Sequence, residues 1–232
     1  MMRSTSWRTI PMRRSDPHKR GTFTRFFWYR IYSGERLFGL KRHNNLHLYG
    51  RRNVWFLYPY KTVSQAHGMR DNDSKRIIGF WEFMDGDERY YPYFYEKYAD
   101  AICQVLWITK TIGEFEIAVV PKSSPDKENI LEKVCSEITR SERFILGKAL
   151  DGTDLIKRVK HMNPFHRGGS YSADEIARSL RITRPLKAKK VILIDDLVFS
   201  GRTDLACRKL LKDAGAEEIY TVCMYGHSRS LC

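Results

Sequence analysis

Several features that would assign a protein class directly are absent from this 232-residue chain. No apolar run approaches the about 20 residues that a membrane-spanning helix needs. The five cysteines are odd in number, scattered along the chain and never in C-x-x-C spacing. This pattern argues against a disulfide framework and a zinc ribbon, and it indicates reduced core residues. We therefore expect a cytoplasmic protein without a membrane partner.

A nucleotide-binding P-loop is also absent. The pattern G-x-x-x-x-G-K-[ST] does not occur, because Gly147-Lys148 has neither the upstream glycine nor the following hydroxyl residue. A buried strand that ends in acidic residues therefore has no P-loop beside it to make it a Walker B segment.

Acidic residues are scarce at the front of the chain. Residues 1–61 carry fourteen Lys or Arg but only Asp16 and Glu35, whereas the other 171 residues carry 27 basic and 25 acidic side chains. Nearly all of the net charge of +14 therefore lies in the first quarter. A segment whose charges are nearly all positive predicts an anionic partner, and we favour nucleic acid.

The composition divides the chain into three segments. Residues 1–25 are rich in Arg and Ser and lack periodic apolar spacing, which predicts a basic arm, flexible when free, rather than a transit peptide. Residues 26–90 contain short aromatic runs, such as 54–58 and 77–81, and predict a small β-rich cap. Residues 91–232 predict an α/β domain.

Aromatic side chains beside Lys and Arg can stack on unpaired bases while the cations contact phosphates. The alternative is that the aromatic residues form the core of the cap and the cations form its solvated surface. On the first interpretation, the candidate DNA or RNA contacts are Arg13, Arg14, Lys19, Arg20, Arg25, Arg30, Lys41, Arg42, Arg51 and Arg52.

The most specific pattern lies in residues 191–203. Residues 191–194 are apolar and mostly β-branched, which is typical of a strand buried on both faces in a parallel sheet. Asp195 and Asp196 end this run. A short loop with hydroxyls, Gly201 and a cation follows, and from Leu205 the apolar residues have helical spacing.

This order of strand, acidic pair, loop and helix favours a ligand that carries both hydroxyls and a phosphate. Ligands of open α/β sheets lie beyond the carboxyl ends of strands. The N–H groups of a tight loop before a helix suit an anion, and Gly201 allows close approach of the backbone. Carboxylates instead accept hydrogen bonds from sugar hydroxyls or hold a divalent cation. A five-carbon sugar phosphate with a metal fits both the acidic pair and the loop. The alternative is that two aspartates end this strand by chance.

These residues resemble the motif that binds PRPP (5-phosphoribosyl 1-diphosphate) in type I phosphoribosyltransferases (PRTases). In that motif a hydrophobic strand runs into two acids and a hydroxyl-rich, glycine-containing loop that ends in Thr. The resemblance covers roughly residues 93–225 and looks closest to the ComF-like branch, although the zinc-ribbon cysteines of many ComF-like proteins are missing. Phe199 stands where the family usually has Thr, and Asp204 puts a negative charge beside the expected phosphate.

The resemblance implies a PRTase type I fold, with a parallel sheet of about five strands flanked by helices. It also implies a Mg²⁺-dependent glycosyltransferase that transfers or cleaves the ribosyl group of PRPP at C1 and releases diphosphate. Asp195 and Asp196 would be catalytic and would hold the metal. The 5′-phosphate would bind to Val198, Phe199, Ser200, Gly201, Arg202 and Thr203.

Two further segments would complete such a site. Lys122 and Ser123 follow a predicted strand over residues 116–120 and would bind diphosphate, with an ordinary turn as the alternative. Arg167 lies in a polar segment, residues 155–170, that resembles the family's mobile loop and would close over the site. An exposed linker is the alternative there.

The remaining elements follow from spacing and capping signals. We expect an amphipathic helix over residues 93–112, a helix with an apolar stripe from Ile130 to Ile138, and a last strand over residues 219–224. Ser172 and Glu175 form a capping box that opens another helix.

Two other function classes stay open. The domain could hold a nucleotide without turnover while the basic front binds DNA or RNA, in a homo-oligomer or a larger nucleoprotein assembly. The same pocket could instead act destructively on nucleotides or RNA in a toxin or defence system. Phe199, Asp204 and the basic front favour the first of these two.

Overall fold

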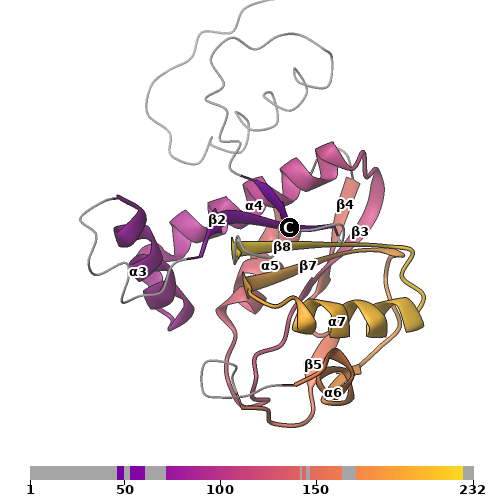
Figure 1. Ribbon diagram of the computed structural model, residues 1–232. Helices are drawn as coiled ribbons and strands as arrows, with labels where there is room; N and C mark the ends of the chain where they lie inside the picture. The colour runs from indigo at the N-terminus through magenta and orange to yellow at the C-terminus, as the bar shows by residue number, and fades with distance from the viewer. Residues whose placement is uncertain are drawn as a thin grey trace, which may run out of the picture. The chain divides into compact units, whose positions relative to one another are not determined.

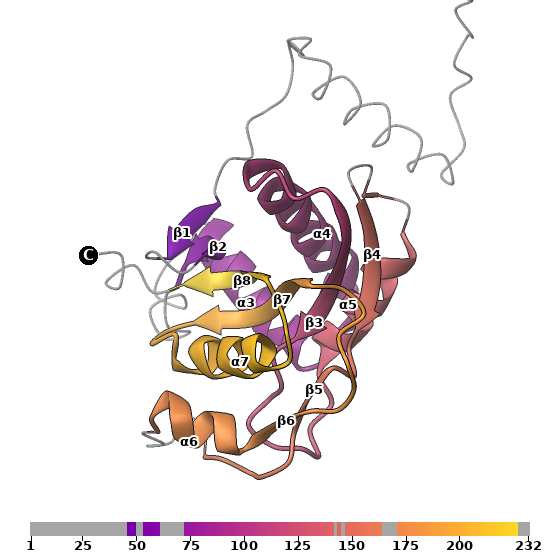
Figure 2. The same ribbon diagram turned by 90° about the vertical axis from the view of Figure 1, so that its right-hand side faces the viewer.

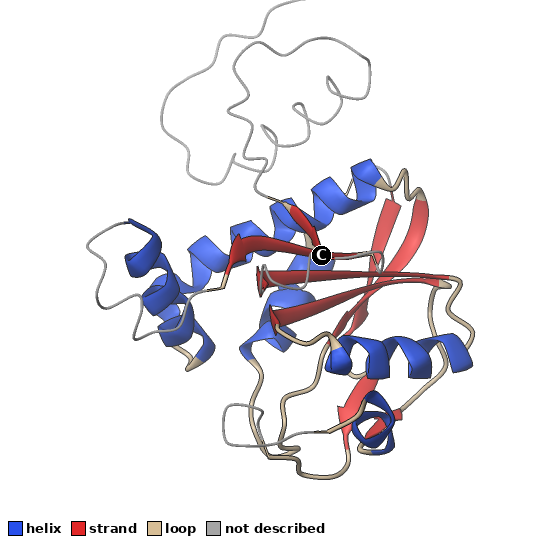
Figure 3. Cartoon of the chain, in the orientation of Figure 1, coloured by secondary structure: helices blue, strands red, loops and turns tan. Residues whose placement is uncertain are grey.

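A six-stranded sheet forms the centre of the computed structural model, which describes residues 46–49, 53–60, 72–141, 143–144, 147–163 and 171–226. The strand order is β1-β2-β8-β7-β3-β4. The bounds are β1 His47–Tyr49, β2 Val54–Pro59, β3 Gly113–Val119, β4 Gly147–Gly152, β7 Lys190–Val198 and β8 Glu218–Gly226. Only β1 is antiparallel to its neighbour, so the expected parallel sheet of five strands is confirmed (Figure 3).

Helices cover both faces of this sheet (Figures 1 and 2). The helices α3 (Asn72–Met84), α4 (Tyr91–Ile108) and α5 (Ile130–Arg140) pack on one face, and a 3-10 turn, η2 (Glu88–Tyr90), precedes α4. The opposite face is covered by α6 (Ala173–Arg178), α7 (Arg202–Asp213) and a two-stranded sheet of β5 (Ile156–Arg158) and β6 (Leu180–Ile182). Within the described ranges, no helix is long and apolar enough to cross a membrane.

The local sequence explains why the central strands and their helices form where they do. Residues 191–194 of β7 are completely buried because both faces of the strand are covered. The capping box that opens α6 is present: the Glu175 N–H donates to the Ser172 hydroxyl, and the Ser172 N–H donates to the Glu175 carboxylate. These predictions are confirmed, with shifts of a few residues at the element ends.

The prediction of a separate β-rich cap is corrected at two places. Residues 77–81 belong to a helix, α3, because Ile77, Phe80 and Met84 recur every three or four residues and fill the core beside α4. Residues 54–59 form β2, which pairs in parallel with β8 inside the main sheet. The α/β domain therefore includes both elements and does not begin at residue 91. The basic arm and the cap residues 26–45, 50–52 and 61–71 lie outside the described ranges.

The segment 155–170 is also more ordered than the mobile-loop interpretation implied. Leu155 and Arg158 are buried, and residues 156–158 form β5, which pairs with β6. Leu155 and Ile156 pack in the core beneath α6 and α7. Residues 164–170, which include Arg167, lie outside the described part of the chain.

The four described cysteines are reduced and lie in the core, as their scattered spacing predicted. Cys103, Cys135, Cys207 and Cys223 are unpaired and buried. Burial raises the pKa of each thiol, which keeps these side chains protonated and unreactive.

Replacing Phe80 tests whether α3 is part of the domain. The Phe80 ring lies 5.1 Å from the Phe94 ring and 5.0 Å from the Tyr225 ring, centroid to centroid, and its side chain is completely buried. We expect Phe80→Ala to lower the free energy of unfolding by about 3–5 kcal/mol in urea titrations, with one cooperative transition. The matched control is Phe199→Ala, whose ring is 54% exposed and should cost under about 1 kcal/mol. A separate early transition for α3 would contradict this placement.

Candidate functional site

The candidate site lies where the direction of the sheet's connections changes. β3 and β7 are parallel neighbours, but β3 leads to α5 on one face of the sheet and β7 leads to α7 on the other. The two loops therefore diverge and leave a crevice at the carboxyl ends of the strands, where ligands of open α/β sheets bind. A hydrogen bond of 3.0 Å from the Val120 N–H to the Ile194 carbonyl ties the two strand ends together.

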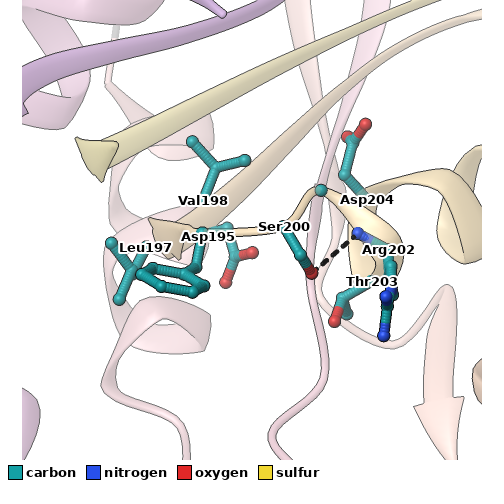
Figure 4. Close-up of a pocket in the computed structure, with 9 residues that line it drawn as sticks. Asp195, Leu197, Val198, Ser200, Arg202, Thr203 and Asp204 are labelled. Carbon is teal, nitrogen blue, oxygen red and sulfur yellow. Dashed lines mark hydrogen bonds between the residues drawn. The ribbon is translucent and has the colours of Figure 1, made fainter. Parts of the chain in front are cut away.

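A pocket of about 60 Å³ opens between the end of β7 and the start of α7 (Figure 4). Asp195 lines it together with all six residues predicted to bind the 5′-phosphate, 198–203. Leu197 and Asp204 complete the lining. The structure thus brings one acidic residue and the whole loop into one pocket. Asp196, Lys122 and Ser123 lie outside its lining.

The backbone of this loop is arranged to present N–H groups. Gly201 has φ of +69°, a left-handed conformation that a residue with a Cβ adopts at a cost, and it precedes the first residue of α7. Gly201 at the N-cap has no capping side chain, and the Arg202 N–H makes a long hydrogen bond of 3.5 Å to the Ser200 hydroxyl. The first backbone bond of the helix runs from the Leu205 N–H to the Gly201 carbonyl. The N–H groups of the first turn belong to residues that line the pocket, and they have no intrahelical acceptor. Such an arrangement suits an anion.

The Phe199 side chain cannot take the part of a phosphate-binding hydroxyl. It is 54% exposed and makes an edge contact with Tyr60, at 6.5 Å between ring centroids. Only its backbone could hydrogen-bond to a phosphate. Hydroxyl donors on the loop are supplied instead by Ser200 and Thr203, and Arg202 adds a positive charge whose guanidinium also donates to the Tyr171 carbonyl at 3.1 Å.

The two aspartates interact with each other at the end of β7. The Asp196 N–H donates to a carboxylate oxygen of Asp195 at 2.9 Å, and the Tyr98 hydroxyl donates to the Asp195 carbonyl at 2.8 Å. Burial raises the pKa of Asp195 well above its usual value, and the neighbouring charge of Asp196 raises it further. Burial also raises the pKa of Asp196, but a hydrogen bond with Asp195 and the Lys122 ammonium partly offset this shift.

This carboxyl pair is suited to a divalent cation only in combination with a ligand. In the described part of the chain, no cluster of three or more His, Cys, Asp or Glu side chains could hold a metal. Mg²⁺ is commonly bound by one or two carboxylates together with substrate phosphates and waters. Asp195 and Asp196 fit that mode, because their charged forms are disfavoured by burial and a cation would relieve this.

Lys122 and Ser123 follow β3 at the same edge of the sheet. The Lys122 ammonium lies 3.5 Å from the Met84 carbonyl at the end of α3, where the helix dipole favours a cation. Its charge acts on Asp196, so the two loops are electrostatically coupled.

Asp204 has a structural role that its sequence position did not indicate. Its carboxylate is 3% exposed, forms an ion pair of 2.8 Å with Arg208 and accepts a hydrogen bond of 2.6 Å from the Thr221 hydroxyl. Arg208 also donates to the Ile219 and Asn53 carbonyls. The negative charge that Asp204 puts beside the loop is therefore compensated within the fold, by Arg208.

Some residues near the site were missed by sequence reasoning, and others cannot be placed. Tyr98 was recognised only as part of a helical apolar face, and Arg158 was assigned to a mobile loop, because neither belongs to a recognisable motif. Arg167 and the ten basic residues proposed to contact nucleic acid lie outside the described ranges.

The fold and the site define an α/β protein with a candidate anion-binding loop at a topological switch point. No family model and no curated protein matches the chain. Among solved structures, it is similar to a purine phosphoribosyltransferase from Pyrococcus horikoshii, at 17% identity and a TM-score of 0.30, over 57% of this chain and 73% of that chain. A similarity at this level assigns neither an activity nor a ligand.

The structural role of Asp204 can be tested with a pair of matched variants. Asp204→Ala would leave Arg208 as a buried cation without its carboxylate, so we expect a loss of about 3–5 kcal/mol in the free energy of unfolding. Asp174→Ala removes an exposed ion pair with Lys209 and should cost about 1 kcal/mol or less. Chemical denaturation monitored by circular dichroism compares the two. Equal small losses would show that Asp204 does not anchor α7.

Proposed function

We propose that this protein binds PRPP, or a related ribose phosphate, together with Mg²⁺ and transfers or cleaves the ribosyl group at C1, as a type I phosphoribosyltransferase of the ComF-like or orphan branch. One observation carries the proposal: Asp195, near the end of β7, and the loop 198–203 line a single pocket. The order of acid, hydroxyl-rich loop and helix N-terminus suits the hydroxyls and the phosphate of one sugar phosphate.

On the ribose side, Asp195 and Asp196 would accept hydrogen bonds from the sugar hydroxyls. Bond breaking at C1 generates positive charge on the ring, and nearby carboxylates would stabilise it electrostatically. The N–H groups at the start of α7 and the hydroxyls of Ser200 and Thr203 would hold the 5′-phosphate. Fixing both ends of the sugar orients C1 for attack.

On the leaving-group side, the C1–O bond breaks and diphosphate departs with the electron pair, while a nitrogen nucleophile bonds to C1. Lys122 and Ser123 would hold the departing diphosphate. Mg²⁺, when bound, would neutralise part of the diphosphate charge. Exclusion of water during this step would favour transfer over hydrolysis, and the segment with Arg167 is the candidate lid.

A second function is favoured by the basic front of the chain. Residues 1–61 carry a net charge of +12, and Phe199 replaces a hydroxyl residue of the motif. The alternative proposal is a module that binds DNA or RNA through the front of the chain and uses the pocket to hold a nucleotide, without turnover or as an effector.

Ligand titration tests the first proposal. We expect isothermal titration to show PRPP binding in the presence of Mg²⁺, and a loss of affinity of at least about tenfold for Asp195→Asn/Asp196→Asn, because charge-assisted hydrogen bonds are lost. Chelation of Mg²⁺ should weaken wild-type binding in the same direction. Asp213→Asn, an exposed carboxylate at the end of α7, is the control and should bind as wild type does. Equal affinity in the double variant would reject the assigned site.

The nucleic-acid alternative predicts a steep dependence on salt. For single-stranded RNA, log K should fall with log salt concentration by about 0.7 per phosphate contact. Neutralising Arg13, Arg14, Lys19 and Arg20 to Gln should flatten this slope in a filter-binding series. Neutralising four exposed cations of the α/β domain, Lys148, Arg181, Lys189 and Lys212, is the control. If both four-residue variants change the salt dependence of log K equally, this would argue against nucleic-acid binding by residues 1–61.

A further inference from the structure

A buried arginine lies directly behind the loop that follows β3. Arg158 is the last residue of β5 and is 9% exposed. Within the described ranges, no carboxylate lies within ion-pair distance of its guanidinium. Its partners are instead the Lys122 carbonyl, at 2.8 Å from Nε, the Pro121 carbonyl, at 3.3 Å from Nη2, the Met162 sulfur and the Ser179 hydroxyl.

Desolvation makes this position unfavourable for a charge. Burial lowers the pKa of Arg158, although a guanidinium remains protonated at any physiological pH. A buried cation without a carboxylate partner is destabilising unless hydrogen bonds replace its water. Two of the bonds that do so end on successive carbonyls of one loop, so the cation fixes the loop's conformation.

The carbonyls on either side of these two are also occupied. The Asn129 side-chain amide donates to the Val120 carbonyl at 3.1 Å, and the Met162 N–H donates to the Ser123 carbonyl at 2.9 Å. Together with the two bonds from Arg158, these contacts hold four successive carbonyls, 120–123.

The direction of the N–H groups follows from peptide geometry. The described peptide bonds are all trans, so each C=O points opposite to the N–H of the next residue. When Arg158 holds the Pro121 and Lys122 carbonyls, the N–H groups of Lys122 and Ser123 must point away from it. Neither N–H donates to another group in the described part of the chain. Successive outward N–H groups form a binding site for anions.

We propose that Arg158 is a positioning residue that presents the Lys122 and Ser123 N–H groups to a diphosphate or a similar polyanion. Its charge lies behind the loop and adds to the Lys122 ammonium. This inference rests on the proposed function for the identity of the ligand, but the geometry of the loop does not depend on it.

The test compares two probes that use different halves of the site. Inorganic diphosphate with Mg²⁺ would contact the loop after β3, whereas ribose 5-phosphate would contact the loop after β7. We expect Arg158→Met to weaken diphosphate binding by at least about tenfold, as loss of an outer-shell partner commonly does, and to change ribose 5-phosphate binding by less than about twofold. Isothermal titration measures both affinities.

Two further variants separate positioning from a general loss of structure. Arg158→Lys keeps the charge but lacks the planar guanidinium whose Nε and Nη2 reach the two carbonyls in a fixed geometry, so its diphosphate affinity should lie between those of wild type and Arg158→Met. It also keeps the test open if Arg158→Met fails to fold. Arg181→Met, an exposed arginine on the paired strand β6, is the matched control and should bind both probes as wild type does.

The outcomes distinguish this inference from the proposed function. Equal losses for both probes in Arg158→Met and Arg158→Lys, or no loss for either probe, would overturn the positioning role. Wild-type protein that binds diphosphate but neither PRPP nor ribose 5-phosphate would refute the proposed function, and a loss of diphosphate affinity in Arg158→Lys that Arg181→Met does not share would then still support the role of Arg158. Wild-type protein that binds none of the three would refute both.

Discussion

The parallel pairing of β3 with β7 is the constraint on which the site depends. Both strands are covered on both faces, so apolar side chains fill their paired registers, from Ile117 opposite Ile192 to Val119 opposite Ile194. Polar groups with ligand-binding capacity can emerge only where the strands leave the sheet. Because the following helices lie on opposite faces, the two strands end side by side at one edge of the sheet, and the candidate site residues 122–123 and 195–203 lie there.

Internal pairing makes this edge stable despite its charges. The Asp204–Arg208 pair and the Thr221 hydroxyl connect α7 to β8, so the helix that carries the phosphate-type loop is anchored at its first turn. Arg158 anchors the loop on the β3 side through carbonyls alone. Each loop is therefore held by buried or partly buried side chains, Asp204 with Arg208 on the β7 side and Arg158 on the β3 side. The Lys122 and Ser123 N–H groups make no hydrogen bond within the described residues.

The sequence predicted the parts of the fold that are encoded locally. The run 191–194, the helix after it and the capping box at Ser172 each depend on neighbouring residues, and each is present. Prediction failed where contacts between residues distant in the sequence determine the secondary structure or the burial of a side chain. The run 77–81 is β-branched and aromatic, yet it is helical because its apolar residues pack against α4 and β8. The burial of Arg158 and Asp204 depends on partners 36 and 17 residues away, Lys122 and Thr221, which no local pattern reveals.

The charge balance of the described site limits the form in which a polyanion can bind. Lys122, Arg158 and Arg202 supply three positive charges near the two loops, whereas Asp195 and Asp196 supply up to two negative charges, and Asp204 is neutralised by Arg208. In their ionised forms these two carboxylates would repel a sugar diphosphate. Burial raises both pKa values and favours the protonated forms, whereas a cation that accompanied the ligand would favour the ionised forms. A divalent cation that bridges ligand oxygens and carboxylates satisfies both requirements, since it neutralises the phosphates and stabilises the ionised aspartates. Under the proposed function, an acidic pair beside the loop 198–203 would be compatible with phosphate binding because a Mg²⁺-bearing ligand would contact both.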